Sequence, residues 1–235
     1  MFAFVNAPLA ADILQVRAPA INFYVLRDAS GLYLIDAGFI GGRFLLRRAL
    51  CRRGWERESI RGIIITHGHL DHILNVAATA RESGAWIAAP RIDADHYAGH
   101  PHYRGWARVT GCLEGVGRPV LSFQPFVPDR WLDDGDFIDV WHGLRAMHLP
   151  GHTHGHMGFH CERLRLLFSA DLFSSYKDMP RLPPRIFNSA PELLPGSIAT
   201  ALALDLRGVI PNHCDREAPE VHLERLRRLR RKNLR

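Results

Sequence analysis

The stretch RGIIITHGHLDH, residues 61–72, joins a run of β-branched residues to a cluster of histidines. Consecutive isoleucines are typical of a strand that is buried on both faces, so residues 61–66 are predicted to form one. The next segment, residues 73–84, has a helical pattern that ends at Gly84. The loop between this strand and this helix therefore carries four side chains of the kinds that bind metal ions: His67, His69, Asp71 and His72.

Each of these four side chains alone has an ordinary structural explanation, such as a hydrogen-bonded loop histidine or an aspartate that caps the next helix. Their combination directly after a β-branched strand favours a metal site instead. The spacing is too short for the HExxH pair of zinc ligands on one helix, but a loop can direct all four side chains to one point. Imidazole and carboxylate suit zinc, and six or seven such ligands are enough for two ions.

Strand-like and helix-like patterns alternate along the rest of the chain. Residues 91–130 are rich in Pro and Gly and are predicted to be irregular. No linker or low-complexity tract interrupts the pattern, so the chain is predicted to be a single α/β domain spanning residues 1–235. Strands are expected in 1–12, three times in 11–36, and in 137–149, 156–170 and 208–211, and helices in 41–54, 191–205 and 222–235.

Composition places the chain among globular proteins, with 47% hydrophobic and 23% charged residues. No apolar run approaches the roughly 18–20 residues that span a bilayer. The N-terminal stretch lacks the charged start and the long apolar centre of a secretory signal. The cysteines are widely spaced and form no CxxC pair, which favours reduced thiols and a cytoplasmic location: Cys51, Cys112, Cys161 and Cys214.

The net charge of +6 is concentrated at the C-terminal end of the chain. Residues 222–235 hold seven Lys and Arg and one Glu, so the rest of the chain is neutral. Leu223, Leu226 and Leu229 recur at helical spacing, which predicts a helix that packs an apolar stripe on the domain and turns its arginines outward. The segment lacks the interleaved aromatic residues of a single-strand binding surface, so a nucleic-acid partner is disfavoured.

IIITHGHLDH resembles the HxHxDH signature of the metallo-β-lactamase superfamily, and the other landmarks of that family follow in order along nearly the whole chain. They are LIDAG with Asp36, LPGHT with His152, FSADLF with Asp171 and IPNHCD with His213. The resemblance implies an α/β fold of four layers, an αβ/βα sandwich. Its metal site would lie at strand ends between two mixed sheets.

The same resemblance implies a role for each matching position. One metal ion would be held by His67, His69 and His152, and a second by Asp71, His72 and His213. Asp171 would bridge the two ions, and Asp36 would orient the ligand loop from behind. The ions are expected to be two zinc ions, with iron or manganese as alternatives.

Two zinc ions about 3.5–4 Å apart bind a shared water, lower its pKa and polarise a substrate oxygen, so no Ser or Cys nucleophile is needed. Asp71 is expected to orient this water or to accept its proton. The resemblance therefore implies a metallohydrolase that cleaves an ester, lactone, thioester or related bond of a small molecule.

Small lactonases of the superfamily resemble the chain best in size and motif set. A native β-lactamase is disfavoured, because Asp171 stands where similar true β-lactamases lack an aspartate. RNA-processing nucleases, flavin-coupled diiron proteins and glyoxalase II-like thioesterases are disfavoured because they usually carry further segments. A phosphodiesterase is a less favoured alternative. Persulfide dioxygenases with a single iron remain the alternative of a different class, and the identity of the metal separates the two.

Three further groups are candidates for the surroundings of the metals. Tyr176 and Lys177 are expected to contact substrate, since lactonases of the family place a tyrosine shortly after the bridging aspartate. His154 and His156 are expected near the pocket but not as ligands, and His160 as a structural residue. The 91–130 region is the candidate lid, with five aromatic or imidazole side chains at its rim: Tyr97, His102, Tyr103, Trp106 and Trp131.

Overall fold

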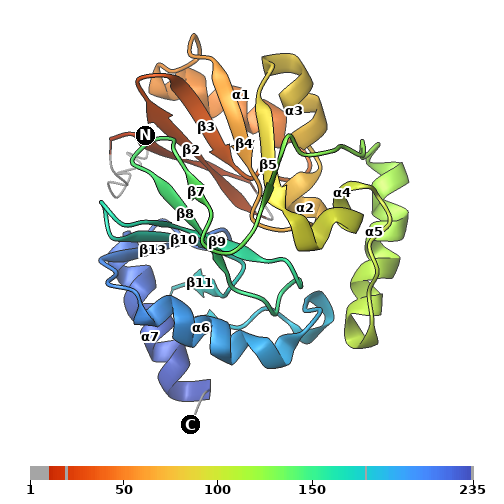
Figure 1. Cartoon of the computed structure of the whole chain (residues 1–235), viewed down its shortest axis with the longest axis vertical. Helices are drawn as coiled ribbons and strands as arrows, with labels where there is room; N and C mark the ends of the chain where they lie inside the picture. Colours follow the sequence, from red (N-terminus) through yellow and green to blue (C-terminus); the bar gives the residue numbers. More distant parts are fainter. Residues whose placement is uncertain (1–10, 19–20, 178, 234–235) are drawn as a thin grey trace, which may run out of the picture.

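Two mixed β-sheets lie face to face between outer layers of helices (Figure 1). The computed structural model describes residues 11–18, 21–177 and 179–233. The first sheet has the order β1-β2-β3-β4-β5-β6, with the strands Ile13–Arg17, Asn22–Asp28, Gly31–Ile35, Ile60–Ile64, Trp86–Pro90 and Arg130–Leu132. The second sheet has the order β13-β10-β9-β8-β7. Its strands are β7 (Phe137–Ile138), β8 (Leu144–His148), β9 (Met157–Cys161), β10 (Leu166–Ala170) and β13 (Gly208–Pro211).

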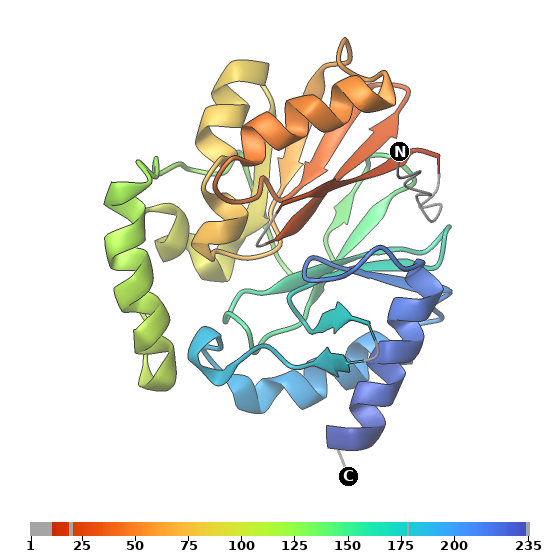
Figure 2. The ribbon, with the colours of Figure 1, turned by 180° about the vertical axis from the view of Figure 1, so that it is seen from behind.

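The helices flank this pair of sheets, and a small hairpin lies below the second one (Figures 1 and 2). The hairpin consists of β11 (Ser174–Tyr176) and β12 (Met179–Arg181). The α-helices are α1 (Gly42–Arg53), α2 (Leu70–Ile73), α3 (Val76–Ser83), α4 (Ala94–Tyr97), α5 (Arg108–Val120), α6 (Leu194–Ala203) and α7 (Pro219–Asn233). Short 3₁₀ turns occupy Arg91–Asp93, Gly105–Ala107, Arg185–Phe187 and Pro191–Leu193.

Three apolar clusters hold the four layers together. The inner faces of the two sheets meet in one cluster, which joins Ile64 of β4 to Phe159 and Phe168 of the second sheet. Ile63 points the other way, into a cluster with α1 and α3. The third cluster packs the second sheet against α6 and α7. The predicted four-layer α/β sandwich is confirmed, and the isoleucine run is explained because β4 is covered on both faces.

Most expected elements are present with small shifts in their bounds. The helix expected over 73–84 is present as α3, which begins at Val76, and a separate short helix, α2, ends at Ile73. Asn75 lies between them, and its side chain donates hydrogen bonds to the carbonyls of Ala37, Gly38 and Phe39. The strand expected over 1–12 lies almost entirely outside the described residues. In the described part of the chain, no helix is both long and apolar enough to cross a bilayer.

The prediction that residues 91–130 are irregular is wrong, because this region contains α5. The amphipathic pattern of α5 is inverted: Glu114 and Arg118 are buried, whereas Leu113 and Val116 are exposed. The two buried side chains form an ion pair, with 2.7 Å between an Arg118 nitrogen and Oε2 of Glu114, and Oε1 accepts a hydrogen bond from the Leu70 amide. Helix prediction from hydrophobic periodicity assumes that apolar residues are buried and charged residues exposed, so it does not identify a helix with the opposite arrangement.

The C-terminal basic helix is present as α7. Its three predicted leucines are buried in the third cluster, and most of its arginines are exposed. Arg225 is the exception: it is buried and pairs with Asp215 at 2.9 Å, on the loop that follows β13. Part of the apparent excess of positive charge therefore serves to fix this loop.

Candidate metal centre

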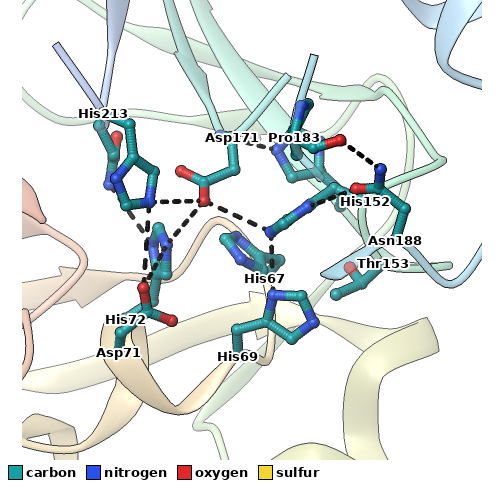
Figure 3. Close-up of polar contacts among 12 residues, drawn as sticks. His67, His69, Asp71, His72, His152, Thr153, Asp171, Pro183, Asn188 and His213 are labelled. Atoms are coloured by element: carbon teal, nitrogen blue, oxygen red, sulfur yellow. Dashed lines mark hydrogen bonds and ion pairs between the residues drawn. The ribbon is translucent and has the colours of Figure 1, made fainter. Parts of the chain in front are cut away.

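Four segments that follow strand ends bring the seven predicted ligands into one cluster (Figure 3). The carboxyl end of β4 delivers His67 and His69, and α2 follows with Asp71 and His72. The other three ligands follow β8, β10 and β13, and they are His152, Asp171 and His213. Parallel pairing explains part of this convergence, because β10 and β13 run in the same direction and end at the same edge.

Asp171 lies at the centre of the cluster. Its Oδ2 is 3.4 Å from Nε2 of His72, 3.3 Å from Nε2 of His152 and 3.0 Å from Nε2 of His213. Nδ1 of His69 lies 2.9 Å from Nε2 of His152. Donor atoms bound tetrahedrally to one zinc ion at about 2.0–2.1 Å are separated by about 3.3 Å. The spacing in the cluster therefore fits atoms that would bind a shared metal ion.

The ligand atoms fall into overlapping groups. Within each group all atoms lie within 4.8 Å of one another, and the groups are His67, His69 and His152; His67, His72 and Asp171; and Asp71, His72 and His213. The first and the third group match the two ligand sets implied by the sequence motifs. Asp171 lies between them, where one carboxylate reaches both.

The hydrogen bonds around the cluster prepare imidazole nitrogens for metal binding. Nδ1 of His67 donates to Thr66 Oγ1 at 3.0 Å, and Nδ1 of His72 donates to Asp36 at 2.8 Å. These bonds leave both Nε2 atoms available to a ligand, and neither has a hydrogen-bond partner among the described residues. Within the same residues, Oδ1 of Asp171 also lacks one. Buried donors of this kind are explained by a cation that they would bind.

Electrostatics supports the same interpretation. Burial, followed by the neighbouring histidines, holds the pKa values of His67 and His69 well below the usual range, so both imidazoles are neutral. Burial alone would raise the pKa of the Asp171 carboxyl. The positive charges of His213 and His72 together lower it by more, so the pKa lies well below the usual range. Burial lowers the pKa values of His72 and His213, but the neighbouring carboxylates, Asp171 first among them, together raise them by more, so the net direction is above the usual range. An ionised carboxylate surrounded by buried imidazoles is a donor set that suits a divalent cation.

Asp36 supports the ligands from behind, as the resemblance implied. It is fully buried at the end of β3, with a φ of 62°, a backbone conformation that is uncommon for a residue other than glycine. Its carboxylate accepts hydrogen bonds from the Thr66 amide at 2.9 Å, from Asn212 at 2.7 Å and from His72. These contacts tie together the loops after β3, β4 and β13.

Sequence reasoning missed two supporting residues. Asn188 accepts a hydrogen bond from Nδ1 of His152 at 2.9 Å and donates one to the Pro183 carbonyl at 2.8 Å. Asp93 accepts hydrogen bonds from the Gly68 amide at 2.9 Å and from Thr153 at 2.6 Å. Neither belongs to a recognisable motif, because each acts on a loop that is distant in the sequence.

The other histidines of the 150–160 stretch belong to none of these donor groups. His156 uses both ring nitrogens, since Nδ1 donates to the Leu149 carbonyl and Nε2 accepts from the Asp171 amide at 3.2 Å. Burial lowers the pKa of His156 to about 3, so it stays neutral and holds Asp171 in place. His154 is exposed, and His160 is buried in β9.

The cluster forms the floor of a cavity of about 510 Å³. Its walls are mainly apolar: Leu113, Gly117 and Leu121 belong to α5 or follow it directly, Phe173 follows β10, and Phe187 belongs to the 3₁₀ turn Arg185–Phe187. Tyr176 also lines this cavity, whereas Lys177 is not among its lining residues. The donor cluster is therefore open to a small molecule that carries an apolar group.

The 91–130 region borders this cavity, but not with the side chains expected at the rim. Thr110, Leu113, Glu114, Gly117 and Leu121 line the cavity. None of the five expected rim residues does so: Tyr97 is buried and packs with Trp131 behind the first sheet, Tyr103 stacks on His69, and His102 and Trp106 are exposed. Tyr97 is the one ring of these five whose burial in the apolar cluster behind the first sheet removes it from the rim.

A family model described as the metallo-beta-lactamase superfamily matches residues 16–211. Among curated relatives, the hydroxyacylglutathione hydrolase of Aeromonas salmonicida (strain A449) is 33% identical over 166 residues, which cover 69% of this chain and 51% of that enzyme. Its counterpart in Aeromonas hydrophila is 34% identical, over 60% of this chain and 42% of that enzyme. The chain thus spans about half the length of these two relatives. An acyl-coenzyme A thioesterase of Gallus gallus is 27% identical over 72% of this chain and 65% of that protein.

Solved structures resemble the chain along most of its length. A metallo-beta-lactamase family protein from Thermus thermophilus superposes with a TM-score of 0.69 at 21% identity, covering 93% of this chain and 77% of that one. A subclass B3 metallo-beta-lactamase of Bradyrhizobium japonicum has a TM-score of 0.67 at 20% identity and covers 93% and 88%. At 20–21% identity, this similarity shows a common fold and nothing more specific.

Proposed function

The chain belongs to the metallo-β-lactamase superfamily, and from this we propose that it is a metal-dependent hydrolase that cleaves a thioester or a related ester of a small molecule. The observation that carries the proposal is the cluster of seven donor side chains at the floor of an apolar cavity. The size and motif comparison favoured lactones as substrates. We place thioesters first because relatives of the chain are named hydroxyacylglutathione hydrolase and acyl-coenzyme A thioesterase.

Two zinc ions are the proposed cofactor, with iron or manganese as alternatives. His67, His69 and His152 would hold one ion, Asp71, His72 and His213 the other, and Asp171 would contact both. When bound, such ions supply Lewis acidity and a water of lowered pKa. The identity and number of the bound metal ions separate this proposal from a single-iron oxygenase.

The chain's own residues would position the substrate and handle the proton. Asp71 lines the cavity and its side chain is about one-third exposed, so its carboxylate is accessible to accept a proton during attack. Tyr176 lines the same cavity, where its hydroxyl would donate a hydrogen bond to the substrate carbonyl. The apolar walls would bury the acyl group and exclude water from it.

Purified protein is expected to contain about two metal ions per chain and to hydrolyse thioesters. Metal analysis of protein prepared without added zinc, followed by assays on thioesters, lactones, phosphodiesters and β-lactams, checks both expectations. Metal content near zero with no gain on zinc addition contradicts the proposal. One iron per chain together with oxygen uptake on a persulfide identifies the oxygenase instead.

Leu113→Ser is expected to lower kcat/KM about tenfold or more for thioesters with an apolar acyl group. The side chain lines the cavity, and burial of a leucine against a ligand contributes about 1.5–3 kcal/mol. Val116→Ser is the matched control, since Val116 is 67% exposed on the same helix and does not line the cavity. If Leu113→Ser and Val116→Ser have the same kcat/KM, for thioesters with apolar acyl groups as well as for those with hydroxylated acyl groups, the cavity does not bind an apolar acyl group.

A further inference from the structure

A second hollow, of about 430 Å³, lies between β1 and α1. Figure 2 shows α1 on the face of the first sheet that is turned away from the second sheet, next to β1, which is the edge strand of the first sheet. Its floor is apolar and includes Val16 and Ala49. Five arginines line it, and together they are called the arginine groove: Arg17, Arg48, Arg52, Arg53 and Arg216.

Among the described residues, no carboxylate lines the arginine groove. The acidic residues that are nearest in sequence to its ends contact other partners: Asp12 accepts hydrogen bonds from Trp141 and His142, and Asp215 pairs with Arg225. On α1 itself, Arg43 and Arg47 form ion pairs with Glu82 outside the groove. Several guanidinium groups around one hollow create a local positive potential that attracts anions.

We propose that the arginine groove binds a small ligand that carries at least two phosphate groups. Guanidinium groups present planar forks of N–H donors that match phosphate oxygens in pairs, and they remain charged at all physiological pH values. Arg48 and Arg52 are one turn apart on α1, and Arg17 faces them from β1, so phosphates in the groove would be contacted from two walls.

The groove favours a small phosphorylated molecule over a nucleic-acid strand. In the part of the chain that the structure describes, its lining contains no aromatic side chain on which a base would stack, and single-strand binding surfaces depend on such stacking. Its volume of about 430 Å³ is that of a site for a small ligand.

The groove adjoins the loop that carries His213. Arg216 follows this ligand by three residues, and Nε2 of Gln15, which lines the groove, is 3.5 Å from Sγ of Cys214. Two sources of phosphate fit this position: the phosphorylated carrier of a thioester substrate, or a separate small molecule. The first source rests on the proposed function, whereas phosphate binding itself does not.

Calorimetric titration of the full chain with adenosine 3′,5′-bisphosphate tests the site. Arg48→Ala/Arg52→Ala is expected to weaken binding at least tenfold. The control Arg43→Ala/Arg47→Ala, on the same helix, is expected to bind as the unmodified protein does. The proposal is overturned if all three proteins bind the bisphosphate equally, or if both variants lose binding to the same extent. It is also overturned if a base-paired or single-stranded oligonucleotide displaces the bisphosphate at a concentration below that of the bisphosphate.

Kinetics with two substrates separates the sources. If the phosphates belong to the substrate, Arg48→Ala/Arg52→Ala raises KM about tenfold for a coenzyme A thioester and leaves a neutral ester of the same acyl group unchanged. If a separate molecule binds, calorimetry shows the loss and both KM values stay the same. Both results support phosphate binding in the arginine groove. If the protein hydrolyses no thioester, the proposed function is refuted, but the calorimetric test of phosphate binding is unaffected.

Discussion

Asp171→Ala is expected to remove most bound metal and to lower kcat/KM by at least about three orders of magnitude. The carboxylate lies within 3.4 Å of nitrogens from His72, His152 and His213, and it is the only carboxylate among the described residues that pairs with all three. Metal ions stabilise charge in the transition state by several kcal/mol, and each 1.4 kcal/mol is about tenfold in rate. Metal analysis and steady-state kinetics on a thioester measure the two effects.

The loss in this variant should come from the metal centre and not from unfolding. Circular dichroism of Asp171→Ala is expected to match that of the unmodified protein, because the substitution removes a buried charge in a cluster held by other hydrogen bonds. Asp205→Ala is the control: this carboxylate is 80% exposed and pairs with Arg165 at the surface. An Asp171→Ala protein that keeps two metals and a tenth of its activity contradicts the assignment.

Asp36→Asn is expected to weaken metal binding about 10- to 100-fold, although Asp36 touches no metal ion in the proposed site. The carboxylate accepts hydrogen bonds from Thr66, His72 and Asn212. An amide of the same shape turns one acceptor into a donor, so the His72 ring loses its fixed tautomer and its orientation. Competition with a metal chelator measures the affinity.

Asp28→Asn is a suitable control for this change, since Asp28 ends the neighbouring strand and binds the Ser30 and Trp141 amides away from the cluster. Metal affinity is expected to be unchanged in Asp28→Asn. If Asp36→Asn binds metal as tightly as the unmodified protein, then Asp36 supports only the backbone of its loop.

Local sequence patterns predicted what depends on neighbours along the chain. The isoleucine run before His67 indicated a strand covered on both faces, and β4 is such a strand. The prediction for residues 91–130 failed because α5 places its polar residues inside, where Glu114 and Arg118 satisfy each other and the Leu70 amide. No periodicity rule anticipates a buried ion pair, since its stability depends on partners elsewhere in the fold.

The sequence by itself determined the family, the layered fold and the set of donor side chains, because strand periodicity and short motifs are properties of contiguous residues. Only the tertiary structure decided which groups support those donors and what surrounds them. Asn188 and Asp93 act across chain separations that no motif spans, and hydrogen bonds to His152 and Gly68 select them. The arginine groove likewise arises where α1, β1 and the loop after β13 meet, although charge counting had placed the positive excess at the C-terminus. Charge in a sequence is summed along the chain, but the potential that a ligand meets is set by distance in space.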